Sequence, residues 1–215
     1  SLNKYYSSNS KILILNLWTK EEHYRIGRKI ILKRIKKDNL SFKNGSLRIG
    51  FMARYNYWKG LRHFDSLYKS LSTICNLEFF VQNANNININ KFTFRSIRDV
   101  SEFYSNIDIY ICTSDIEGFC LPIFEALLYG SVVVTTYQPA AIEYIPSELI
   151  DNGFFMCKEL GKENESQIVS NLLKEIKKAL KFRKDSIKYK KFLLKTLEWN
   201  KEKFLLYRKP IKNKV

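Results

Sequence analysis

The chain has 215 residues, of which 45% are hydrophobic and 27% are charged. This composition is typical of a globular protein with its own core and excludes a disordered or fibrous chain. Because 37 Lys and Arg outnumber 21 Asp and Glu, the formal net charge is +16, which favours an anionic partner such as a nucleotide, a nucleic acid or a membrane surface.

The predicted elements alternate between strands and helices along the chain. Apolar runs predict strands at residues 11–17, 47–53, 77–82, 91–95, 107–112, 131–135 and 153–157. A first helix is predicted to begin after Thr19, and further helices are predicted at residues 59–72, 97–104, 122–129 and 139–145. The tail from about residue 166 is predicted to form two helices, with a break near Asp185. Apolar strands that alternate with helices predict an α/β, Rossmann-like parallel sheet with helices on both faces.

The excess positive charge is concentrated in two parts of the chain. Residues 168–215 hold 16 Lys and Arg against 4 Asp and Glu, and residues 20–37 hold 8 against 2. Two interpretations stay open. These helices have solvated faces in a lysine-rich protein, or they rest on anionic lipid or another polyanion.

Four cysteines provide no sign of a structural framework. Cys75, Cys112, Cys120 and Cys157 form no C-x-x-C pair and have no cluster of histidines nearby, so we expect neither disulfides nor a zinc site. No run reaches 18 apolar residues, and residues 11–18 are too short for a signal peptide. We therefore expect a cytoplasmic protein, with a membrane-peripheral placement left open.

Parallel sheets bind ligands beyond the carboxyl ends of their strands, so we examined the loops that follow the predicted strands. The loop after the strand at residues 47–53 places Arg54 and Lys59 next to the start of a helix. Two cations beside unpaired helix N–H groups can clamp a diphosphate. The alternative is that both are ordinary surface residues of a basic protein.

A second group of residues follows the strand at residues 107–112. Glu117 lies in the loop and Glu125 on the next helix, so both carboxylates can border one cleft and accept hydrogen bonds from a sugar diol. Gly118 permits close approach of the backbone to a ligand. The N–H groups of residues 119–121 (Phe119, Cys120 and Leu121) lie at the positive end of the helix.

The sequence E-G-F-C-L-P-I-F-E-A-L-L-Y-G, from Glu117 to Gly130, resembles the E-G-F-G-L-P-x-x-E-A-x-x-x-G signature of retaining GT-B glycosyltransferases, the glycogen-synthase-like and sucrose-synthase-like family. Residues 50–60 resemble the family's G-R-x4-K-G segment, and residues 131–145 and 151–155 resemble its later strands in the same order. The resemblance covers residues 47–157 and implies one half of a GT-B fold.

The resemblance also implies roles for individual residues. Arg54 and Lys59 would bind the diphosphate of a nucleotide-sugar and stabilise the departing nucleoside diphosphate, Glu117 would contact the donor sugar, and Glu125 would hold the ribose. Arg95 falls where the family contacts the base. The remaining donor-binding positions are Gly118, Phe119, Cys120 and Leu121. No metal or other cofactor is implied.

Departures from the family pattern limit what the resemblance implies. Cys120 and Ser131 each replace a glycine, and a GT-B enzyme has a second Rossmann-like domain that carries the acceptor site. We expect residues 1–45 to be a strand–helix preface or a remnant of an interdomain segment, and residues 46–215 to be the nucleotide-sugar-binding domain with basic C-terminal helices. The missing N-terminal domain would then act in cis or in trans.

These observations predict a retaining glycosyltransferase donor domain, weakly active or incomplete as this chain, with a glycan, lipid or protein as acceptor. The alternative is a sugar-nucleotide-binding or interaction module without transferase activity. A nucleic-acid partner is disfavoured, because the chain lacks a recognisable nucleic-acid-binding motif. Of the other polar residues, His23 and His63 are expected to pack or to lie at the surface, and Asp108 and Asp115 to form loops or caps.

Overall fold

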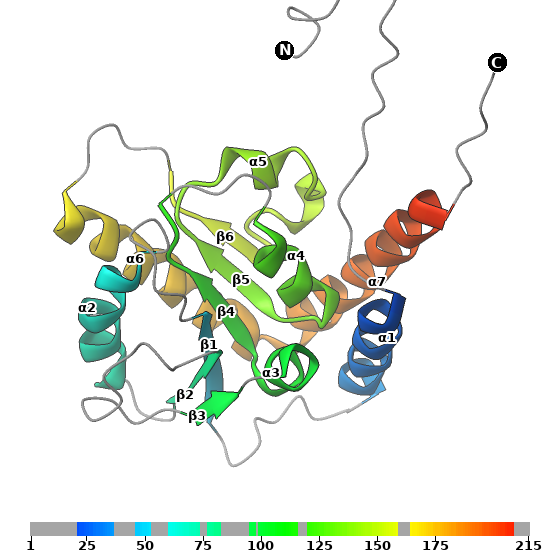
Figure 1. Cartoon of the computed structure of the whole chain (residues 1–215), viewed down its shortest axis with the longest axis horizontal. Helices are drawn as coiled ribbons and strands as arrows, with labels where there is room; N and C mark the ends of the chain where they lie inside the picture. The colour runs from blue at the N-terminus through cyan, green and yellow to red at the C-terminus, as the bar shows by residue number, and fades with distance from the viewer. Residues whose placement is uncertain are drawn as a thin grey trace, which may run out of the picture.

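The computed structural model describes residues 21–36, 46–52, 60–73, 77–82, 95–97, 99–115, 120–158 and 164–208. These residues form a six-stranded parallel sheet in the order β3-β2-β1-β4-β5-β6, surrounded by helices (Figure 1). The strands are β1 (Leu47–Met52), β2 (Leu77–Gln82), β3 (Arg95–Ile97), β4 (Ile109–Cys112), β5 (Val132–Thr135) and β6 (Phe154–Met156). The α/β, Rossmann-like fold class is confirmed.

The helices are α1 (Glu21–Lys36), α2 (Leu61–Ser72), α3 (Val100–Asn106), α4 (Leu121–Leu128), α5 (Pro139–Ile142), α6 (Glu165–Lys184) and α7 (Ser186–Arg208), with a short 3-10 helix η6 (Ser147–Leu149). Helices α2 and α6 pack together, and α3 and α4 pack with α1 (Figure 1). Helix α7 packs against α1, α4 and α6. None of the helices in the described ranges is both long and apolar enough to cross a membrane.

The order of the strands reverses between β1 and β4, and the region beyond the carboxyl ends of these two strands is called the β1–β4 crevice below. The chain proceeds from β1 outward to β2 and β3, then returns to the centre, where Ile49 of β1 pairs with Ile109 of β4. From β4 it proceeds outward in the other direction to β5 and β6. All residues of β4 and β5 are buried, as expected for strands covered on both faces. The crevice at such a reversal is where these sheets bind ligands.

Most element boundaries agree with the sequence-based prediction to within two residues, but those of β3, α3 and α5 do not. Helix α5 ends at Ile142, three residues before the predicted end. The structure extends β3 to Ile97 and begins α3 at Val100, whereas the pattern predicted a strand ending at Arg95 and a helix from Ile97. The reason is a cap. The side chain of Asp99 accepts a hydrogen bond from the N–H of Glu102 at 2.6 Å, and this interaction sets the start of the helix. The strand predicted at residues 11–17 lies outside the described residues.

A buried ion network joins the amino end of the sheet to the helices. The carboxylate of Asp108 accepts hydrogen bonds from Arg48 Nε at 3.0 Å and from Arg183 Nη2 at 2.9 Å. Burial alone would raise the pKa of Asp108, but Arg183, Arg48 and Arg34 together lower it below its ordinary value. Arg34 also donates to the carbonyl of Ile107 at 2.7 Å. Asp108 therefore holds α6 against β1 instead of forming a loop or a cap.

Candidate functional site

The start of α2 lies beside the residues that follow β4. Gly60, which precedes α2, has φ of 63°, and a side chain there would collide with the carbonyl oxygen of Thr113, which follows β4. The left-handed backbone and the close approach both require glycine. The start of α2 is therefore anchored beside the end of β4.

Asp115 strengthens this anchoring. Its Oδ2 lies 2.6 Å from Nη2 of Arg62, and its Oδ1 lies 3.3 Å from Nε2 of His63. His63 is completely buried, which agrees with the packing role expected for it. For Asp115 the sequence suggested a loop or cap, whereas the structure shows a bridge from the loop after β4 to the first turn of α2. A bridge between segments over 50 residues apart leaves no local pattern.

The loop between β5 and α5 holds the segment after β4 from the other side. Nε2 of Gln138 donates to the carbonyl of Ser114 at 2.8 Å, and the hydroxyl of Thr136 donates to the same oxygen. Thr136 and Gln138 are both buried. The backbone at residues 113–115 is thus fixed by contacts from α2 and from the β5–α5 loop.

Helix α4 begins at Leu121, shortly after this segment in the chain. Cys120 precedes it with φ of 54° and ψ of 56°, a left-handed conformation in a residue other than glycine. Non-glycine residues reach this region at a cost of about 1 kcal/mol or more. A glycine at this position would adopt the same conformation without that cost. The first N–H groups of α4 carry the positive end of the helix dipole, and Leu121 beside them is exposed.

Two thiols lie beneath the start of α4. Sγ of Cys112 at the end of β4 is 3.6 Å from Sγ of Cys120, and both residues are buried. The hydrogen bond from Cys120 lowers the pKa of Cys112 to about 7. Within the described ranges no group of three metal-ligating side chains is found. The contact between the two thiols packs the end of β4 against Cys120, the residue that precedes α4.

Tyr104 of α3 orients Glu125 on α4. The tyrosine hydroxyl donates to Oε2 of Glu125 at 3.2 Å and also lies 3.2 Å from the carbonyl of Pro122. Burial and the neighbouring carboxylate raise the pKa of Tyr104 well above its ordinary value, so the hydroxyl keeps its proton. Sequence reasoning missed this residue. The only available signal was a tyrosine in the apolar pattern of residues 97–104.

The structure brings some of the predicted site residues together. Cys120, Leu121 and Glu125 lie at the start of α4, beside the crevice. Arg95 is the first residue of β3 instead of the last residue of its strand. The remaining predicted residues, which are Arg54, Lys59, Glu117, Gly118 and Phe119, lie outside the described residues, and their roles stay predictions.

Comparison with known proteins identifies the family. The family model described as "Glycosyl transferases group 1" matches residues 33–191. No curated protein sequence matches the chain.

Similar solved structures include sucrose-phosphate synthase from Thermosynechococcus elongatus (TM-score 0.55, 12% identity, covering 96% of this chain and 54% of that chain). The catalytic domain of starch synthase IV from Arabidopsis thaliana, bound to ADP and acarbose, has a TM-score of 0.54 and 14% identity over 87% of this chain and 42% of that chain.

The C-terminal domain of LpcC, a glycosyl transferase group 1 family protein from Francisella tularensis, is similar with a TM-score of 0.50 and 20% identity, covering 74% of this chain and 86% of that domain. At these identities the structural likeness concerns the fold, which is one half of a GT-B fold. The chain spans about half of the sucrose-phosphate synthase structure and less of the starch synthase structure. The family model matches residues 33–191, which is more than half of this chain, and the chain therefore belongs to the glycosyl transferases group 1 family.

Proposed function

We propose that this chain is the donor-binding half of a retaining glycosyltransferase that takes its sugar from a nucleoside-diphosphate sugar. The observation that carries the proposal is the close approach of Gly60 to Thr113 beyond the carboxyl ends of β1 and β4, because these two residues flank the segments that match the family pattern. The likeness to a starch synthase solved with ADP supports a nucleoside diphosphate as part of the ligand.

The chemistry requires charge stabilisation at the bond that breaks. Cleavage of the sugar–oxygen bond builds positive charge on the sugar and negative charge on the leaving phosphate. Cations held where the negative charge develops lower the barrier. We assign this role to Arg54 and Lys59, with the positive end of α4 as a further contribution, and we assign Glu117 to the donor sugar.

The ribose is assigned to Glu125, whose orientation is fixed by Tyr104. Because the hydroxyl of Tyr104 occupies a hydrogen-bonding position on Oε2, the carboxylate is held in one rotamer instead of sampling several. A fixed carboxylate is a better acceptor for two neighbouring hydroxyls, since less side-chain entropy is lost on binding. Tyr104 is in this proposal a positioning residue and not a catalytic one.

The acceptor is assigned to another domain, in cis or in trans, because this chain spans only part of the synthases it resembles. A glycan, a lipid or a protein remains open as acceptor. The second candidate is a binding module without transferase activity, which the same incomplete coverage favours. Acceptor-dependent transfer of sugar by this chain together with its partner domain separates the two candidates.

Calorimetric titration with nucleoside, nucleoside diphosphate and nucleotide-sugar tests the assignment, after a thermal-shift panel of UDP-, GDP- and ADP-sugars has chosen the base. Lys59→Ala and Arg54→Ala should weaken binding of the diphosphate more than that of the nucleoside. Glu125→Gln should weaken binding of all three ligands, by about 1.5–3 kcal/mol per lost charge-assisted bond. Glu117→Gln should affect the nucleotide-sugar alone. Absence of any binding by the wild-type chain would contradict the proposal.

A further inference from the structure

Helices α1 and α7 pack side by side (Figure 1), and a groove is lined by residues of α1 and by Phe204 of α7. The two helices run antiparallel. The ring of Tyr24 stacks on that of Phe204 at 4.0 Å and 7°, while at the other end Arg34 donates to the hydroxyl of Tyr189 at 2.9 Å. The groove has a volume of about 380 Å³. Its lining residues are Glu21, Tyr24, Arg25, Arg28, Lys29, Leu32 and Phe204.

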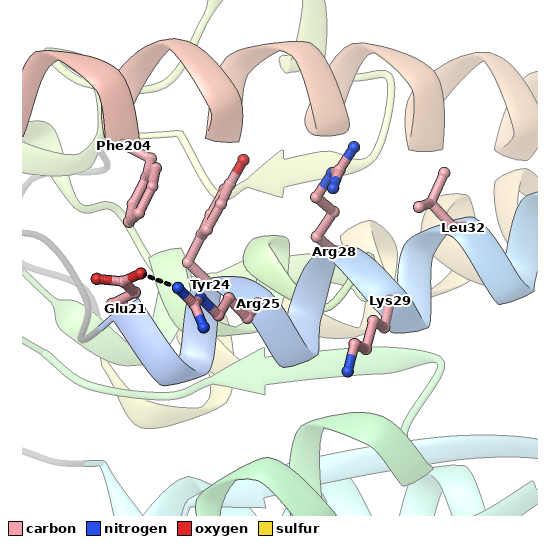
Figure 2. Close-up of a pocket in the computed structure, with 7 residues that line it drawn as sticks. All are labelled: Glu21, Tyr24, Arg25, Arg28, Lys29, Leu32 and Phe204. Atoms are coloured by element: carbon pink, nitrogen blue, oxygen red, sulfur yellow. Dashed lines mark ion pairs between the residues drawn. The ribbon is translucent and has the colours of Figure 1, made fainter.

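The groove combines apolar walls with exposed cations. Tyr24, Leu32 and Phe204 supply the apolar part, and Figure 2 shows Arg28 pointing from α1 toward α7. The one acidic lining residue, Glu21, is paired with Arg25 at 2.6 Å. Arg28 and Lys29 are both exposed. Site geometry of this kind suits an amphiphilic anion, with a phosphate at the cations and an apolar chain along the walls.

Helix α7 presents an apolar stripe beside the groove. Ile187, Leu194 and Leu205 are exposed by 68%, 45% and 51%. Their spacings of seven and eleven residues put them on one face, because each residue advances about 100° around a helix. The exposed Glu198 lies on the same face, between Leu194 and Leu205. Leu205 follows Phe204 directly and therefore lies about a quarter turn from the groove wall. The stripe is thus continuous with the groove.

Lysines flank this stripe on both sides. Lys190 and Lys201 lie between the stripe and α1 by helical position, and Lys191 lies on the far side, all exposed. Residues 186–208 hold seven Lys and Arg against two acidic residues, Glu198 and Glu202. An aliphatic stripe bordered by lysines is the pattern of helices that lie in a membrane interface. Surfaces that bind single-stranded nucleic acid instead use aromatic side chains on which bases stack.

We propose that the α1–α7 face docks on a bilayer that contains anionic phospholipid. Arg28 and Lys29 contact lipid phosphates at the groove, and Ile187, Leu194 and Leu205 enter the boundary between headgroups and acyl chains. This inference does not depend on the proposed sugar transfer. It accounts for the positive charge of both α1 and α7 by one ligand, anionic phospholipid.

Co-sedimentation with vesicles of phosphatidylcholine, with and without phosphatidylglycerol, tests the proposal on the whole 215-residue chain. The wild type should bind only the anionic vesicles, less at higher salt. Arg28→Glu with Lys29→Glu should reduce the partition constant about tenfold or more, since each basic residue near the surface contributes to binding. The matched control, Lys177→Glu with Lys181→Glu on exposed positions of α6, changes net charge equally and should bind much more tightly than the α1 variant.

A second variant separates lipid from other polyanions. Leu194→Gln with Leu205→Gln leaves the charge unchanged and should reduce vesicle binding several-fold. Circular dichroism melts should show that all variants fold, because the substituted side chains are exposed. Equal binding to neutral vesicles, or equal loss in the α6 control, would overturn the proposal. So would unaltered vesicle binding of the leucine variant together with displacement by RNA, because the face would then bind polyanions in general.

Discussion

The hydroxyl of Tyr104 and the carboxylate of Glu125 lie 3.2 Å apart and join α3 to α4 beneath the β1–β4 crevice. Tyr104 is completely buried, while Glu125 is partly exposed. A tyrosine that is fixed in the core therefore orients a carboxylate at the candidate site. Its effect on binding can be separated from its effect on stability.

Tyr104→Phe should weaken binding of a nucleoside diphosphate by about 0.5–1.5 kcal/mol, the usual contribution of one hydrogen bond. Binding of the 2′,3′-dideoxy analogue should change little, because it lacks the hydroxyls assigned to Glu125. Calorimetry with both ligands measures the difference. Tyr129→Phe is the matched control, since it removes a buried hydroxyl that donates to Ser101 at 2.8 Å and should not alter discrimination. Equal losses for both ligands would assign Tyr104 a purely structural role.

Gly60→Ala should lower the free energy of unfolding by about 1–3 kcal/mol, the range for overpacked sites. The added methyl group would meet the carbonyl of Thr113, and the backbone at Gly60 is left-handed. Urea denaturation provides the measurement. Ser66→Ala, at an exposed position of α2, should change stability much less. A Gly60→Ala variant as stable as the wild type would show that Gly60 and Thr113 are not in contact.

Asp108→Asn should lower the free energy of unfolding by about 3–5 kcal/mol, because it leaves the buried guanidinium of Arg183 without its charged partner. Asp151→Asn, an exposed position, serves as control. The effect has a defined pH dependence. Since the folded pKa of Asp108 lies below its ordinary value of 3.8, the stabilisation is present above that pH and is lost as the pH falls through the folded pKa. The gap between wild type and variant should therefore close in acid, and a gap that is constant with pH would contradict the ion network.

Tyr129 should make the protein sensitive to alkali. Burial raises the pKa of Tyr129 from 10.0 to about 12. Its contribution to stability is complete below pH 10, where both states are protonated, and is lost as the pH rises through 12. The melting temperature of the wild type should thus fall more steeply above pH 10 than that of Tyr129→Phe. Parallel curves for the two proteins would show that the hydroxyl ionises equally in both states.

Local sequence patterns were sufficient for much of the architecture. The strand at residues 77–82 and the break between the last two helices at Asp185 agree with the structure. Both follow from periodicity and from turn-forming residues within a short window. The boundary between β3 and α3 was wrong because a capping aspartate, Asp99, outweighed the apolar pattern on either side. The group 1 glycosyltransferase family was likewise identified from one segment around Glu117–Gly130 and its neighbours in chain order.

Contacts between distant segments could not be predicted in this way. Asp115 reaches Arg62 across 53 residues, and Arg34 reaches Ile107 across 73. Tyr104 meets Glu125 only because α3 and α4 both pack against α1. Residue types and spacing are properties of the local chain, and they decided which segments become strands, helices and site loops. The order of the strands in the sheet decided which of those segments become neighbours, because pairing β1 with β4 depends on the free energy of packing the whole core and not on any short stretch of sequence.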